Sequence, residues 1–235
     1  MVGFMREAAK VSSAGAFTLT SSRAAAFEKP PPGERPLVSS DTFLHDAVDR
    51  ALAVPAEAIL AYQASKVEGE KAAWDLYRKK GLGSHYAFDT ILPDWVNGAP
   101  ANPRPGFYST STGIAEFYGG LYGPANIFYI FTHPPSTCVS LRDVAALHVI
   151  SLAAGEVNEE RLFATQDTWC AADVVKVIGK VDAAWKPPKG YAESAPFPRS
   201  DIGVPNERFR ELILRYAIRP LIDLDESIAE VVSAY

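Results

Sequence analysis

The sequence contains little cysteine, no long basic segment and no long hydrophobic run. Its two cysteines, Cys138 and Cys170, lie far apart and belong to no C-x-x-C pair, which argues against a zinc site or a disulfide framework. Lys and Arg total 23 against 28 Asp and Glu, which gives a net charge of −5, and only Arg78, Lys79 and Lys80 are consecutive. We therefore expect buried thiols, no metal site and no nucleic-acid partner.

The absence of a long apolar run bears on where the protein resides. The longest apolar stretch, residues 144–154, is interrupted by His148 and Ser151. It is too short to span a bilayer and is typical of a buried helix. The first ten residues carry charge at Arg6 and Glu7 and lack the apolar stretch of a secretory signal. We therefore expect a cytoplasmic protein without a membrane segment.

What the chain does contain is enough apolar sequence for one sizeable core, because 48% of its 235 residues are hydrophobic. Short apolar segments that favour strands alternate with segments of helical periodicity. We expect strands at 16–22, 85–93, 137–141 and 161–165, with a loop at 94–98. We expect helices at 2–10, 43–51, 58–80, 109–118, 142–154, 171–181, 207–216 and 225–232. This alternation predicts an α/β fold with a mostly parallel sheet.

One expected helix places Tyr62 and Lys66 four residues apart and therefore on one face. A phenol has a pKa near 10, and a neighbouring cation stabilises the phenolate. Such a tyrosine can give its proton to a carbonyl oxygen while a hydride reaches the carbonyl carbon. The spacing alone is weak evidence, because an ordinary helix with a packed tyrosine and a solvated lysine has the same pattern.

The segments around this pair occur in a distinctive order. They read "FTLTSS", "YQASKVEGEKAAW", "LPDWVNG", "VSLRDVAALHV" and "RLFAT". Together they resemble the extended short-chain dehydrogenase/reductases, specifically the fungal aldehyde or ketone reductases related to dihydroflavonol reductase, within the NAD-dependent epimerase/dehydratase superfamily. The resemblance covers nearly the whole chain. It implies a partial Rossmann-like, doubly wound parallel sheet over residues 1–98 and a smaller α/β substrate lobe over residues 99–235, whose later strands return to the main sheet.

The resemblance also implies roles for individual residues. Ser22 would orient a substrate carbonyl, Tyr62 would donate the proton, and Lys66 would stabilise the phenolate and hydrogen-bond the nicotinamide ribose. The residues expected to contact the cofactor or lie beside it are Tyr62, Lys66, Pro93, Ser109 and Ser111. Asp143 and His148 are expected to support the fold rather than to catalyse.

A glycine-rich loop for a dinucleotide is missing from the sequence. The only G-x-G is at Gly81 and Gly83, where Tyr86 occupies the position of the third glycine. Gly120 and Gly123 are followed by Asn126 and open no helix after a strand, as a pyrophosphate-binding loop must. The matched part of the family begins after its first strand–helix units, which are roughly 90–110 residues long and carry that loop. We therefore expect the amino-terminal strands and the cofactor-binding half to be absent.

These observations leave three functions open. By resemblance the chain is an NAD(P)H-dependent carbonyl reductase, with NADP favoured over NAD, and it is expected to be inactive or impaired as it stands. It is alternatively a non-catalytic remnant that binds a small molecule or a partner, or an epimerase/dehydratase-type enzyme. Trp95 and residues 107–108 suggest an apolar or aromatic carbonyl substrate. The strand at 16–20 is expected to leave one edge open, which favours self-association.

Overall fold

The computed structural model describes residues 2–11, 13–28, 38–54, 57–101, 109–126, 136–191 and 203–235. The strands are β1 (Ala16–Thr20), β2 (Ala87–Pro93), β3 (Trp95–Asn97), β4 (Ser136–Ser140), β5 (Arg161–Ala164) and β6 (Asp167–Trp169). The α-helices are α1 (Val2–Ala8), α2 (Ala47–Ala53), α3 (Ala58–Lys79), α4 (Thr110–Tyr118), α6 (Leu141–Ala153), α7 (Ala171–Val181), α8 (Glu207–Leu212) and α9 (Leu224–Ser233). The shorter turns are η1 (Arg23–Ala25), η2 (Leu82–Ser84) and the π-helical η3 (Ile213–Ala217).

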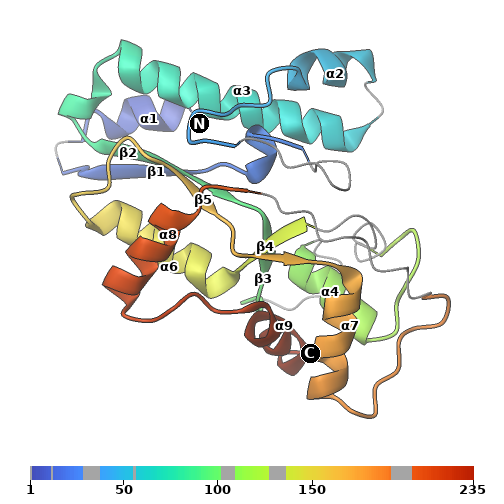
Figure 1. Ribbon diagram of the computed structural model, residues 1–235. Coiled ribbons are helices and arrows are strands. Elements are labelled where there is room, and N and C mark those ends of the chain that lie inside the picture. The colour runs from blue at the N-terminus through green and yellow to red at the C-terminus, as the bar shows by residue number, and fades with distance from the viewer. Residues whose placement is uncertain are drawn as a thin grey trace.

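The first sheet, sheet A, has the strand order β1-β2-β5, and both pairings are parallel. Helices α1 and α3 lie over one of its faces, and α6 and α8 lie over the other (Figure 1). This arrangement agrees with the general rule that parallel strands are covered on both faces. β1 is an outer strand, and no strand of the described chain pairs with its second edge.

Helix α3 is held on sheet A by aromatic packing. Trp74 and Tyr77 from the helix meet Phe88 of β2, with ring centroids 4.5 and 5.2 Å away. All three side chains are buried, together with Met5 of α1. Burying a side chain of this size stabilises the fold by about 1.5–3 kcal/mol. The helix stops where Gly81 adopts a left-handed backbone conformation, with φ of 60°.

The second sheet, sheet B, joins β3 and β4 in parallel and β4 and β6 antiparallel. It lies in the lower lobe together with α4, α7 and α9 (Figure 1). The apolar faces of these helices enclose Phe117, Ile178 and Val231, which are fully buried. The lobe thus has a core distinct from the one beneath α3.

The expected α/β fold with a parallel sheet is confirmed, and the four expected strands all form. The loop expected at 94–98 was wrong, because residues 95–97 pair with β4 as β3. The helix expected at 43–51 was also partly wrong, since α2 begins only at Ala47. The helix at 144–154 is not fully buried: Val149 is 65% and Leu152 is 53% exposed, because only the opposite side of α6 faces sheet A.

The partial Rossmann-like sheet is present as expected, with no partner for the second edge of β1 in the described ranges, and β5 returns from the second half of the chain to join it. The division into two parts at residue 98 remains a prediction. In the described ranges no helix has the length and apolar character needed to cross a membrane. Cys138 is buried as expected, whereas Cys170 is only partly buried, and neither forms a disulfide.

Candidate active site

The candidate site lies at the carboxyl ends of the strands of sheet A. Because the strands are parallel, the end of β1 lies beside Ile91 of β2, and Pro93 of β2 lies beside Ala164 of β5. Ser22 follows β1 by two residues, so it emerges at the same edge as Pro93. In open α/β sheets this edge is where ligands bind.

Ser22 begins the short turn η1. Its Oγ accepts a hydrogen bond from the backbone N–H of Ala24 at 3.2 Å, and the residue is buried. The neighbouring Arg23 Nε lies 3.0 Å from Asp94 Oδ1, and these two side chains are only 10% and 5% exposed. This ion pair ties the residue after Ser22 to the residue after Pro93, and so holds the two strand ends together.

Tyr62 and Lys66 lie on the first half of α3, as the spacing predicted. The Lys66 ammonium nitrogen is 5.6 Å from the centroid of the Tyr62 ring, and Tyr62 is 44% exposed. Within the described ranges, the Tyr62 hydroxyl and the Lys66 ammonium have no hydrogen-bond or ion-pair partner. Both polar groups are therefore available to a bound molecule.

Lys66 lines a cleft of about 260 Å³ that opens beside β1. Its walls are formed by Leu19, Thr20, Ser21, Ser65, Lys66, Gly69 and Glu70. Ser22 and Tyr62 are outside this lining, although α3 packs against the η1 turn that Ser22 begins. The structure therefore brings Lys66 next to the strand end that carries Ser22, with Tyr62 one helical turn before it.

Glu70 is a fully buried carboxylate at the base of this cleft. It accepts hydrogen bonds from Ser21 Oγ at 2.6 Å and from Thr90 Oγ1 at 2.9 Å. Its other partner is Arg161, whose Nε lies 2.6 Å from Glu70 Oε1. One residue of α3 thus binds β2, β5 and the residue that directly follows β1, and it lies one turn after Lys66. This network fixes the helix that carries Tyr62 and Lys66 relative to the strand ends.

Asp94 connects the site to the second sheet. Its Oδ2 accepts a hydrogen bond from Thr137 N at 3.2 Å and a shorter one from the Thr137 hydroxyl. Trp95 Nε1 donates to Ser136 Oγ at 2.6 Å. The first residues of β4 are therefore bonded to the segment that follows Pro93.

Ser109 and Ser111 lie at the start of α4 in the lower lobe. Ser109 caps the helix, since its Oγ accepts from Thr112 N at 3.1 Å. Ser111 Oγ accepts from the backbone N–H of Gly98 at 3.2 Å and is buried. The structure thus joins α4 to the end of β3, five residues beyond Pro93. Residues 107–108, expected near a substrate, lie outside the described residues.

Polar groups of α6 and β2 on sheet A have structural partners. Asp143 accepts from Arg219 Nη1 at 2.6 Å and from Ile222 N at 2.8 Å. His148 Nε2 lies 2.7 Å from Thr20 Oγ1, which links α6 to β1. Burial raises the pKa of Asp89 to about 6, although hydrogen bonds from Glu160 N and Ser151 Oγ act in the opposite direction. Among the residues described, no group of His, Cys, Asp and Glu has the arrangement of a metal site.

Three residues of the site were not identified from the sequence, although their positions in the chain contain signals for their roles. Arg23 and Asp94 each follow a residue expected in the site, and their opposite charges favour a pair once the strands lie side by side. Glu70 occupies the position one turn beyond Lys66 on the face that turns toward the sheet. Its partners lie 20 to 91 residues away in the chain, which is why the pattern of α3 alone did not identify it.

Comparison with curated proteins finds reductases. The chain is 27% identical over 169 residues to aldehyde reductase 2 of Sporidiobolus salmonicolor, covering 70% of this chain and 48% of that protein. It is 32% identical over 120 residues to ketoreductase adrE of Penicillium rubens, covering 51% and 33% respectively. The chain therefore spans half or less of the length of these relatives. No protein-family model matches it.

Solved structures show the same fold. Yeast methylglyoxal/isovaleraldehyde reductase Gre2, in complex with NADPH, superposes with a TM-score of 0.75 at 18% identity, covering 99% of this chain and 67% of that one. Vestitone reductase from alfalfa gives 0.71 at 12% identity, covering 99% and 68%. UDP-glucose 4-epimerase from Thermus thermophilus, with NAD, gives 0.60 at 15% identity, covering 99% and 67%. The chain is thus similar in sequence to fungal aldehyde and ketone reductases, and it shares its Rossmann-like fold with solved reductases and with an epimerase.

Proposed function

We propose that this chain carries the proton-donating groups of an NAD(P)H-dependent aldehyde or ketone reductase. The observation that carries the proposal is the pairing of Lys66 with Tyr62 near the carboxyl ends of parallel strands. Both polar heads lack partners in the described structure, as groups that meet a ligand should. The names of the matched relatives support an aldehyde or ketone as the substrate.

The residues present fit one end of a nicotinamide cofactor. Lys66 has three free donors for ribose hydroxyls, and the backbone of Pro93 lies at the strand edge where the nicotinamide would sit. Ser109 and Ser111 remain proposed neighbours of the cofactor or substrate. The sequence offers no glycine-rich loop for the pyrophosphate. When bound, the reduced nicotinamide would supply the hydride. NADP is favoured, in line with the NADPH complex of the yeast reductase.

The chain's own residues would handle the proton. Tyr62 donates its hydroxyl proton to the carbonyl oxygen, and the Lys66 ammonium stabilises the phenolate left behind. Ser22 Oγ already accepts from Ala24 N, so its own O–H remains free to donate to the same carbonyl oxygen. Glu70 takes no direct part in this proton transfer, but its hydrogen bond from Ser21 holds Ser21 and α3 in place. Two donors then converge on the oxygen that gains negative charge.

The chain by itself is proposed to be inactive or impaired, because the pyrophosphate has no binding loop in these 235 residues. The same observation motivates the alternative of a non-catalytic protein that binds a small molecule or a partner chain. The fold shared with UDP-glucose 4-epimerase motivates an epimerase/dehydratase-type reaction as another alternative. Micromolar, saturable binding of NADPH to the purified chain would favour an enzyme over a remnant.

A chimera tests the proposal directly. It joins the residues of aldehyde reductase 2 from Sporidiobolus salmonicolor that precede its matched segment to this chain. The chimera should oxidise NADPH in the presence of an aromatic aldehyde or ketone. Lys66→Ala in the chimera should weaken both turnover and NADPH binding, because Lys66 serves both, whereas Lys80→Ala is the matched control at the exposed end of α3. A folded chimera that binds NADPH but reduces no carbonyl compound would contradict the reductase assignment.

A further inference from the structure

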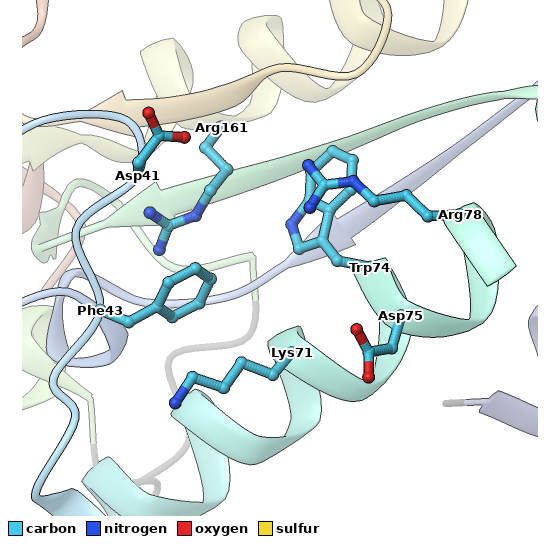
Figure 2. Close-up of a pocket in the computed structure, with 7 residues that line it drawn as sticks. All are labelled: Asp41, Phe43, Lys71, Trp74, Asp75, Arg78 and Arg161. Carbon is cyan, nitrogen blue, oxygen red and sulfur yellow. The ribbon is translucent and has the colours of Figure 1, made fainter.

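A second cleft lies along the side of α3 turned away from Lys66. Its volume is about 230 Å³, and it is lined by Asp41, Phe43, Lys71, Trp74, Asp75, Arg78 and Arg161. The four α3 residues are spaced i, i+3, i+4 and i+7, so they form one face of the helix. Figure 2 shows Phe43 and Arg161 opposite Trp74 and Arg78, with Lys71 at the lower end. We call this the Phe43–Trp74 cleft. It shares no lining residue with the Lys66 cleft.

Two cations in this cleft lie over aromatic rings instead of pairing with carboxylates. The Lys71 ammonium is 5.5 Å from the centroid of Phe43, and the Arg78 guanidinium is 4.8 Å from that of Trp74. In the part of the chain that the structure describes, neither forms an ion pair. A cation held only by a ring can still bind an anion, since it has kept its hydrogen-bond donors.

The other charged residues of the cleft form no ion pair with these two cations in the part of the chain that the structure describes. Asp75 is already paired with Lys79, at 2.7 Å, and Arg161 is paired with Glu70. Asp41 lies at the Arg161 end of the cleft, away from Lys71 (Figure 2). Lys71 therefore presents an ammonium without an ion-pair partner among the described residues, beside the rings of Phe43 and Trp74 and one helical turn from the Asp75 carboxylate.

Trp74 adds an unused donor. Its Nε1 is buried and has no hydrogen-bond partner among the described residues. Figure 2 shows this nitrogen on the side of the indole that faces Phe43 and Arg161, with the Arg78 guanidinium in front of the ring. A buried N–H without an acceptor is unfavourable. A carboxylate that displaces the Arg78 guanidinium from the ring would therefore bind both that guanidinium and Trp74 Nε1.

We propose that the Phe43–Trp74 cleft binds a small aromatic carboxylate. The carboxylate would lie between Lys71 and Arg78 and accept from Trp74 Nε1, and the flat ring would contact Phe43, whose own ring lies 3.9 Å from the Arg161 guanidinium. The volume suits a single substituted ring and excludes a dinucleotide. Because the cleft is separate from Tyr62 and Lys66, this site does not depend on the reductase assignment.

The test is a titration of the full chain with sodium benzoate, followed by the indole N–H signals in ¹H–¹⁵N NMR spectra. Trp74→Phe assigns the Trp74 signal among the four tryptophans. Benzoate should shift that signal saturably, with a Kd of about 10 mM or tighter for a ligand of this size. Lys71→Gln and Arg78→Gln should each weaken binding about tenfold, because a charge-assisted contact is lost. Lys80→Gln removes the same charge from the exposed end of α3 and should leave binding unchanged.

Two matched probes separate charge from shape. Benzamide has the same ring but no charge, and should not produce a saturable shift. Inorganic phosphate has charge but no ring, and should bind more weakly than benzoate. Equal binding of benzamide, tighter binding of phosphate, or no saturation by benzoate at about 50 mM would each overturn the proposal.

Discussion

Replacing Glu70 by alanine should destabilise the protein severely, because the change leaves buried polar groups without a partner. The carboxylate is fully buried and accepts from Ser21, Thr90 and the Arg161 guanidinium, which is itself only 6% exposed. Removing one partner of a buried ion pair costs about 3–5 kcal/mol. In a chain of this length each kcal/mol lowers Tm by about 2–4 °C, so we expect a fall of about 6–20 °C.

Urea unfolding followed by circular dichroism measures the loss in free energy. Two variants control for the mechanism. Glu70→Gln retains one acceptor oxygen and should lose less stability than Glu70→Ala. The double variant Glu70→Leu with Arg161→Met replaces the pair by apolar side chains of similar size and should be more stable than Glu70→Ala alone. If Glu70→Ala unfolds within about 0.5 kcal/mol of wild type, the network does not hold α3 against the strands.

Three further changes test other parts of the structure. Burial raises the pKa of Asp89 from 3.8 to about 6. The folded state therefore binds the carboxyl proton of Asp89 more tightly than the unfolded state does, so the contribution of Asp89 to stability falls as pH rises from about 4 to about 6. Asp89→Asn should remove that fall in urea unfolding compared at pH 4 and pH 7, and an identical pH dependence in both proteins would contradict the reasoning. Gly98→Ala should lower the free energy of unfolding by about 1–3 kcal/mol, because Gly98 has a φ of 152° and the added Cβ would lie 2.7 Å from Leu141 Cβ. Gly179→Ala is the control: its Cβ would lie in open space, so the change should be neutral or stabilising. The open edge of β1 should make the chain self-associate at micromolar concentration in sedimentation velocity. Thr20→Lys should reduce this self-association, since a lysine on an edge strand opposes pairing. A wild-type chain that stays monomeric at every concentration would refute the expectation.

The elements around the candidate site were predictable because their signals are local. The apolar and small residues of α3 recur at helical spacing over 22 residues, and β2 is a short segment with apolar residues on both sides of Asp89 and Thr90 that ends at a proline. The placement of Ser22 and Pro93 at one edge then follows from the parallel pairing. Tyr62 and Lys66 were expected on one face, and the 5.6 Å between the Lys66 ammonium nitrogen and the Tyr62 ring centroid agrees with that spacing.

The parts that were missed depend on contacts between distant segments. β3 and β6 have only three residues each, and they become strands because β4 lies between them. The delayed start of α2 at Ala47 has a similar origin. The Arg161 guanidinium carbon lies 3.9 Å from the centroid of the Phe43 ring, and the Thr42 carbonyl accepts a hydrogen bond from Arg161 Nη1. These contacts hold the segment against Arg161, so it does not continue the helix. Local periodicity contains no information about such partners.

Tyr62→Phe in the chimera tests most directly the proposal that Tyr62 donates the proton in carbonyl reduction. The change removes only the phenolic hydroxyl, so we expect turnover with a carbonyl substrate to fall by about 10²–10⁴-fold. The Kd for NADPH should remain nearly unchanged, and Tyr235→Phe, at the exposed end of the chain, is the matched control. A Tyr62→Phe chimera that reduces the same substrate at the rate of its parent would show that Tyr62 is not the acid.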